Sequence, residues 1–150
     1  MSTASLPSSL TGSPKAALVP PGECQFTTEF VAVPLLERFP VSSTSSVLRF
    51  ALPDTTKPLQ LSTCACILAS AEIDGETVVR PYTPISTNAD IGYFDLLVKN
   101  YGDNAKMSRF MHEIEPSSTT ISFKHIDFNV KIQAPFAFDH IVMLVGGTGT

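Results

Sequence analysis

Short runs of β-forming residues, separated by clusters of turn residues, recur along most of this chain. Residues 27–36 are rich in β-branched and aromatic side chains, and residues 47–52 alternate, with Leu48, Phe50 and Leu52 on one face. Further runs span 64–73, 77–82, 93–99, 119–123 and 127–132, whereas only 106–113 has the apolar spacing of a short helix. The pattern predicts a mainly all-β fold, a six-stranded antiparallel barrel with Greek-key links and one short helix.

Length and composition limit the chain to a single folded unit. Its 150 residues support one domain well and two poorly. Hydrophobic residues make up 43% and charged residues 16%, and no run approaches the roughly 20 apolar residues that cross a bilayer. The net charge of −4 offers no basic stripe for nucleic acid. We therefore expect a globular domain with no transmembrane segment and no nucleic-acid partner.

The first 22 residues are rich in Ser, Pro and Ala and show no apolar periodicity, which predicts a disordered leader. They lack the arginines and the amphipathic face of an organelle transit peptide. Three cysteines, an odd number that includes the pair Cys64 and Cys66, fit a reducing compartment and do not complete a zinc set. These features predict a cytoplasmic location and no metal site. A mitochondrial or membrane-associated location stays open.

The segment Arg80-Pro81-Tyr82-Thr83-Pro84-Ile85-Ser86 concentrates a cation, an aromatic ring and hydroxyl groups around two rigid prolines. The planar fork of Arg80 suits an anionic pyrophosphate, and the ring of Tyr82 suits a flat cofactor ring. The hydroxyl of Thr83 suits a ring heteroatom. The alternative is a strand that ends in a turn, with Arg80 as an ordinary surface charge.

This segment resembles the flavin motif of the ferredoxin reductase superfamily. Together with Ile73-Asp74-Gly75 before it and the sequence Gly-Tyr-Phe-Asp-Leu at 92–96, it resembles the NADH-cytochrome b5 reductase family. Lys106-Met107-Ser108 resembles another block of that family, and the sequence at 140–149 resembles the strand and glycine turn that begin its nicotinamide domain.

The resemblance implies a division of the chain into a leader at 1–22, an FAD-binding barrel at 23–138 and the start of a truncated NAD-binding domain at 139–150. A strand is expected at 141–145. On this interpretation the chain as given reduces no acceptor with NADH, because the dinucleotide needs the rest of that domain for orientation.

The resemblance also implies the roles of individual residues. Arg80 pairs with the FAD pyrophosphate, Tyr82 lies along the flavin, and Thr83 approaches the redox edge of the ring as the catalytic residue. The start of the helix at 106–108 offers an anion site. The complete cofactor-binding set is Arg80, Pro81, Tyr82, Thr83, Ser86, Leu97, Lys99, Lys106, Met107, Ser108, Gly147 and Thr148.

The implied activity is electron transfer from NADH through FAD to a haem-protein acceptor such as cytochrome b5. A basic patch for an acidic acceptor would draw on Lys99, Lys106, Arg109, Lys124 and Lys131. The alternative function is a non-catalytic FAD-binding or interaction barrel that lacks the NADH domain.

Ala105 stands where the resembling family has glycine. If the backbone there has a positive φ, Ala105→Gly should stabilise the fold. If it has an ordinary conformation, glycine should destabilise it by about 0.5 to 1 kcal/mol, with Asn104 available as the N-cap of the helix. We favour the second outcome.

Overall fold

The computed structural model describes residues 24–62, 65–126 and 137–146. The predicted leader, the run at 127–132, Lys131 and the turn residues Gly147 and Thr148 lie outside these ranges.

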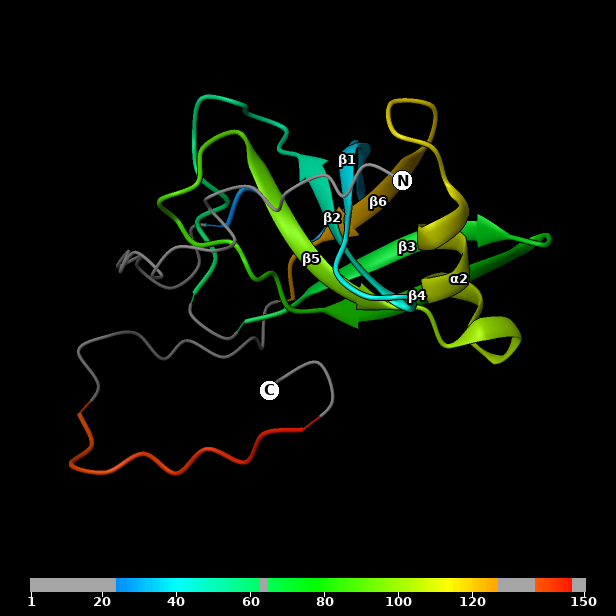
Figure 1. Ribbon diagram of the computed structural model, residues 1–150. Coiled ribbons are helices and arrows are strands. Elements are labelled where there is room, and N and C mark those ends of the chain that lie inside the picture. The colour runs from blue at the N-terminus through cyan, green and yellow to red at the C-terminus, as the bar shows by residue number, and fades with distance from the viewer. Residues whose placement is uncertain (1–23, 63–64, 127–136, 147–150) are drawn as a thin grey trace.

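Six antiparallel strands form one sheet within the described residues (Figure 1). They are β1 (Val31–Pro40), β2 (Ser45–Ala51), β3 (Ile67–Ile73), β4 (Glu76–Tyr82), β5 (Tyr93–Lys99) and β6 (Thr120–Lys124). Their order across the sheet is β4-β3-β6-β1-β2-β5. The helical segments are the single turn η1 (Gly102–Asn104) and α2 (Lys106–Glu113). The predicted mainly-β architecture with one short helix is confirmed.

Two strands begin later than predicted. The carbonyl of Thr27 accepts a hydrogen bond from the backbone N–H of His125 at 2.8 Å, and β1 begins only at Val31. Cys66 precedes β3, which begins at Ile67. In both places, residues with high β propensity lie outside the hydrogen-bonded strand.

The β3–β4 hairpin closes with the turn that its sequence predicts. Ile73 pairs with Glu76, which leaves Asp74 and Gly75 as the two turn residues. Their φ angles are +53° and +77°, and a type I′ turn requires positive φ at both positions. The turn matches the right-handed twist of the strands, and it places the tip of the hairpin beside α2.

Aromatic rings from separate parts of the chain meet at the centre of the core. Phe50, Phe94 and Phe123 come from β2, β5 and β6, and Phe26 comes from the segment before β1; all are fully buried. Their ring centroids lie 5.0 to 5.8 Å apart, mostly edge to face, as the ring quadrupole favours. The core therefore ties the edge strand β5 and its neighbour β2 to β6 and to the segment before β1.

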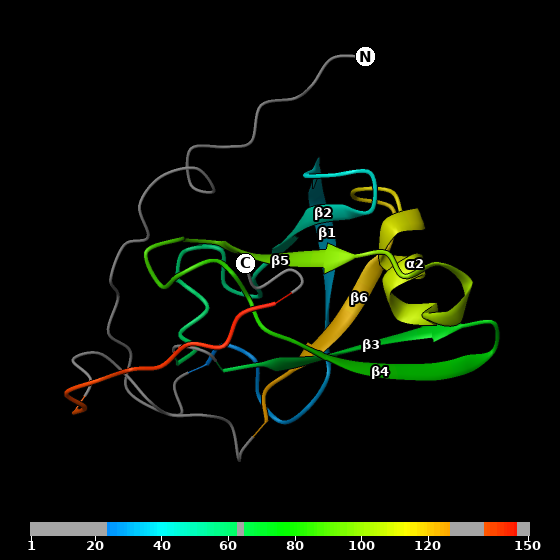
Figure 2. The same cartoon turned by 60° about the horizontal axis from the view of Figure 1, so that its bottom comes forward.

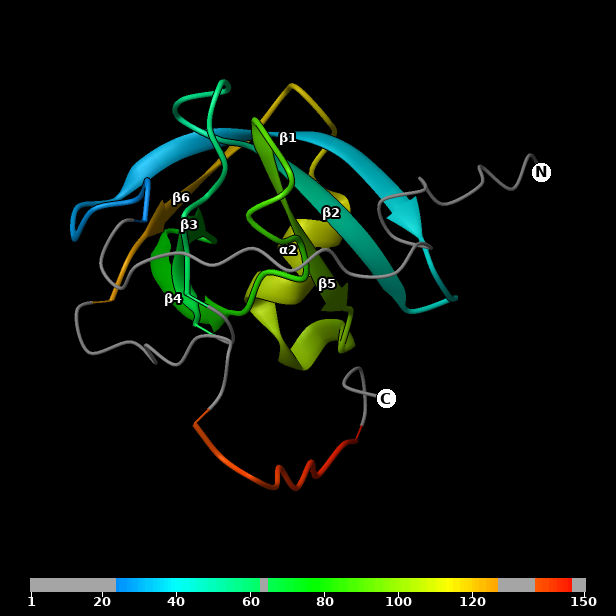
Figure 3. The ribbon, with the colours of Figure 1, turned by 90° about the vertical axis from the view of Figure 1, so that its left-hand side faces the viewer.

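The sheet curls, and α2 lies across its open side between the edge strands β4 and β5 (Figures 2 and 3). Met107 and Met111 of α2 are buried, and Phe110 packs against the core. This is the apolar face that the spacing at 106–113 predicts. The first turn of the helix is thereby held next to the ends of β4 and β5.

The strand expected at 141–145 is not formed. Residues 137–146 contain no strand, and the side chains of Val142 and Leu144 are 86% and 97% exposed. A strand exists only through hydrogen bonds to a neighbour, and no described residue pairs with this segment. None of the described helices is both long enough and apolar enough to cross a membrane.

Candidate functional site

A cavity of about 570 Å³ lies between the end of β4, the end of β5 and the start of α2. This volume falls within the range of small-molecule sites. The cavity collects residues that are far apart in the sequence, and each described member of the predicted set lines it except Ser86. The lining residues are Arg80, Pro81, Tyr82, Thr83, Ile85, Leu97, Val98, Lys99, Tyr101, Ala105, Lys106, Met107 and Ser108.

The wall formed by β4 provides a cation and an aromatic ring. The guanidinium of Arg80 is exposed; its Nη1 donates to the carbonyl of Val79 at 2.7 Å, and no carboxylate of the described residues lies within 4.0 Å of it. Tyr82 is half-buried against the core. Burial raises the pKa of Tyr82 to about 12, although the charge of Arg80 acts in the opposite direction. This wall therefore offers an available positive charge beside a neutral phenol.

The loop after β4 is attached to β5 at Asp95. The backbone N–H of Ile85 donates to the carbonyl of Asp95 at 2.9 Å, and the backbone N–H of Asp95 donates to Ser86 Oγ at 3.0 Å. Ser86 thus faces the backbone of β5 rather than the cavity. Thr83 is exposed and lines the cavity. The attachment at Ile85 and Ser86 follows it in the same loop and therefore restrains its position.

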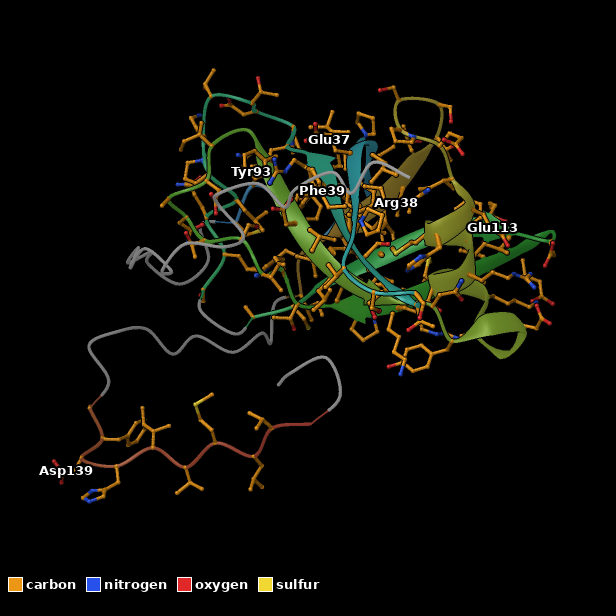
Figure 4. All side chains as sticks on the ribbon, viewed as in Figure 1. Glu37, Arg38, Phe39, Tyr93, Glu113 and Asp139 are labelled. Carbon is orange, nitrogen blue, oxygen red and sulfur yellow. The ribbon has the colours of Figure 1, made fainter. Side chains whose placement is uncertain are left out.

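A buried ion pair fixes β5 to β2 at the same position. Arg49 Nε and Nη2 donate to the two oxygens of Asp95 at 2.9 and 2.8 Å, and the two side chains are 12% and 1% exposed. The guanidinium also lies 3.9 Å from the ring centroid of Tyr93 and 5.1 Å from that of Phe39. Figure 4 labels Tyr93 and Phe39. The hydrogen bonds from Arg49 to Asp95 raise the pKa of this guanidinium further, so Arg49 stays charged.

The wall formed by β5 continues into an exposed aromatic residue. Leu97 and Lys99 line the cavity, and the Lys99 ammonium lies 5.3 Å from the ring centroid of Tyr101. Tyr101 is 64% exposed. Tyr101 is not among the residues predicted from the sequence, although an aromatic residue two positions after Lys99 and directly before a turn is a usable signal.

The first turn of α2 has no side-chain cap. Its N-cap is Ala105, with φ −131° and ψ 78°. The negative φ agrees with the favoured alternative of an ordinary backbone conformation, whereas the expectation for Asn104 is wrong, because Asn104 ends η1 and lies one residue before the cap. Backbone N–H groups at a helix start favour an anion when no side chain covers them.

Because Ala105 occupies the N-cap, a capping side chain there should alter stability and anion binding separately. We expect Ala105→Ser and Ala105→Asp each to stabilise the ligand-free chain by about 1 kcal/mol, since both supply an oxygen to the free N–H groups. Ala105→Asp should then weaken an anionic ligand at the helix start more than Ala105→Ser, because it adds a negative charge. Urea unfolding and ligand titration of both variants measure the two effects. An equal change in affinity for the anionic ligand in the two variants would contradict an anion site at this position.

The same finding revises the expectation for glycine at this position. Glycine caps a helix better than alanine, which opposes its greater freedom in the unfolded chain. Ala105→Gly is therefore expected to change stability little rather than to destabilise the fold.

Acidic side chains surround the two cations of α2. Lys106 Nζ lies 2.5 Å from Glu76 Oε2, and Arg109 lies within 4 Å of carboxylate oxygens of Asp74, Asp103 and Glu113. Since two cations face four carboxylates, this face of the molecule has no surplus of positive charge. Within the described residues, α2 does not form the basic patch considered from the sequence.

Comparison with known proteins connects this arrangement to flavoenzymes. The family model "Oxidoreductase FAD-binding domain" matches residues 32–132. NADH-cytochrome b5 reductase 1 of Candida albicans is 37% identical over 129 residues, which cover 81% of this chain and 40% of the relative. The protein of the same name from Scheffersomyces stipitis is 38% identical over 128 residues, covering 80% and 41%. The chain thus spans about 40% of the length of these curated relatives.

A solved structure shows the same fold. The cytochrome b5 reductase domain of Ulva prolifera nitrate reductase matches with a TM-score of 0.58 at 24% identity, over 69% of this chain and 48% of that one.

Proposed function

Because this chain belongs to the oxidoreductase FAD-binding domain family, we propose that it binds FAD in the cavity between β4, β5 and α2. We further propose that it is the flavin-binding part of an NADH-dependent reductase that passes electrons to a haem-protein acceptor such as cytochrome b5. The observation that carries the proposal is the convergence on one cavity of the available Arg80 guanidinium, the half-buried Tyr82 and the uncapped start of α2.

These groups suit a flavin dinucleotide. Arg80 and the backbone N–H groups of Lys106, Met107 and Ser108 would hold the pyrophosphate, since both kinds of donor favour an anion. Tyr82 would lie along the flavin and the ribityl chain with Pro81 beside it, and Leu97 and Lys99 would complete the wall. Tyr101 would offer a flat apolar surface to a second ring.

When bound, FAD supplies the chemistry of accepting a hydride and releasing single electrons. The chain contributes position and polarity. Thr83 would donate a hydrogen bond to the ring, and the attachment of Ile85 and Ser86 to Asp95 would keep that hydroxyl in place. The domain division into a barrel at 23–138 and the start of an NAD-binding domain at 139–150 is part of the same proposal, with Gly147 and Thr148 in the nucleotide turn.

We also propose a reducing compartment such as the cytoplasm. The odd number of cysteines supports it, as does the free thiol of Cys24. Burial raises the pKa of the Cys24 thiol to about 11, which makes it unreactive at neutral pH.

Binding of FAD and of riboflavin, which lacks phosphates, tests the proposal. Arg80→Ala is expected to weaken FAD by about 1.5 to 3 kcal/mol, the contribution of a hydrogen bond to a charged group, and to change riboflavin affinity little. Flavin fluorescence in equilibrium titrations measures both. Lys57→Ala is a matched control, because it removes one exposed cation outside the cavity. Absence of FAD binding by the parent chain, or equal losses for the two flavins, would contradict the proposal.

A further inference from the structure

The start of α2 is joined to the tip of the β3–β4 hairpin by two ion pairs. Lys106 Nζ lies 2.5 Å from Glu76 Oε2, and Arg109 Nη2 lies 3.8 Å from Asp74 Oδ2. Glu76 is the first residue of β4, directly after the Asp74-Gly75 turn. The type I′ turn therefore fixes where this carboxylate stands relative to the helix.

Lys106 belongs both to this contact and to the cavity. It is the first residue of α2, and it lines the cavity beside Ala105 and Met107. Its ammonium is directed to the hairpin tip, where its hydrogen bond to Glu76 lowers the pKa of that carboxyl and favours its charged form. A phosphate at the helix start would compete with Glu76 for the same ammonium.

We propose that Glu76 is a positioning residue that restrains the Lys106 ammonium at the hairpin tip and thereby lowers the affinity of the cavity for phosphate-bearing flavins. The inference rests on the proposed FAD site and extends it. Glu76 does not line the cavity, so it acts through Lys106. It sets how strongly the site prefers FAD over a flavin without phosphates.

The exposure of the pair limits the size of the effect. The side chains of Lys106 and Glu76 are 42% and 68% exposed, and exposed ion pairs contribute at most about 1 kcal/mol, which corresponds to about fivefold in affinity. We expect Glu76→Gln to tighten FAD binding about threefold. The gain should shrink as the salt concentration rises, because both charges are accessible to ions.

The chain offers a closely matched control. Glu113 also pairs with a cation of α2, with Oε1 3.7 Å from Arg109 Nε, and its side chain is 65% exposed. Glu113→Gln makes the same change in net charge at the other end of the helix. We expect it to leave FAD affinity unchanged.

The test is a double-mutant cycle with FAD, riboflavin and inorganic pyrophosphate as probes, titrated by fluorescence or calorimetry. Glu76→Gln should tighten FAD and pyrophosphate but not riboflavin, and the gain should disappear in a Lys106→Met background. A gain of equal size in that background, an equal gain from Glu113→Gln, or no gain for either phosphate probe would overturn the inference.

The pyrophosphate titration separates this inference from the proposed function. If the parent chain binds no FAD while Glu76→Gln still tightens pyrophosphate through Lys106, the proposed function fails and the restraint by Glu76 stands. If FAD binds to the parent and Glu76→Gln alters neither phosphate probe, the restraint is refuted and the FAD site remains.

Discussion

Replacing Asp95 by Asn is expected to destabilise the fold by about 3 kcal/mol, because it takes from a buried guanidinium its only buried carboxylate among the described residues. The Asp95 side chain is 1% exposed and accepts two hydrogen bonds from Arg49, which is itself 12% exposed. Arginine keeps its charge at any pH at which proteins fold, so Arg49 cannot adapt by losing a proton. Urea unfolding, with the free energy obtained from the midpoint and the slope, measures the loss.

Glu37→Gln is the control for this prediction. Glu37 also faces Arg49, at 3.5 Å, but its side chain is 56% exposed. Its removal is expected to alter the unfolding free energy by less than about 1 kcal/mol, as is usual for surface pairs. Similar losses in the two variants would show that burial does not govern the contribution of this pair.

Gly92→Ala is expected to lower the free energy of unfolding by about 3 kcal/mol, the second large effect. The loss is the sum of backbone strain and steric overlap. Gly92 has a φ of +84°, and a Cβ atom there would lie 2.6 Å from the backbone oxygen of Thr55. Two hydrogen bonds hold Gly92 in place. Its backbone N–H donates to the carbonyl of Lys57 at 3.0 Å, and its carbonyl accepts from the N–H of Leu52 at 2.9 Å. Thermal or urea unfolding measures the change.

Gly75→Ala separates the two contributions. Gly75 has a similar φ of +77°, but a Cβ atom there would meet nothing within 4 Å. Only the conformational cost remains, about 1 kcal/mol. If both glycine variants lose the same free energy, the close approach to Thr55 is not what requires glycine at position 92.

Features with a local cause were predictable at the level of single residues. The bounds of α2 and β5 agree with the expected ranges of 106–113 and 93–99. The Asp74-Gly75 turn also follows from the sequence, because it depends on the conformational freedom of two adjacent residues. Alternation identified Leu48 and Phe50 of β2 as core residues, and both are fully buried, although Val47 on the other face is buried as well.

Features with a distant cause were not predictable in this way. Arg49 and Asp95 are 46 positions apart, and nothing near Arg49 in the sequence marks it as half of a buried pair. Asn104 had the right chemistry for a cap, but it ends η1, and Ala105, directly before the helix, is the N-cap. The apolar run at 141–145 has a strong β propensity, yet a strand needs a neighbour to pair with, and the described residues provide none.

The sequence by itself determined the class of fold, the hairpin, the helix and the chemical types that belong in the site, because each of these depends on neighbouring residues or on the periodicity of a short segment. The tertiary structure decided which of those residues share one cavity. It brought Arg80, Lys99 and Lys106 together at the open side of the sheet, turned Ser86 away toward Asp95, and placed Glu76 against Lys106. The physical reason is that such contacts depend on how the sheet curls and where α2 packs against its edges, and both are fixed by the packing of side chains that lie far apart in the sequence.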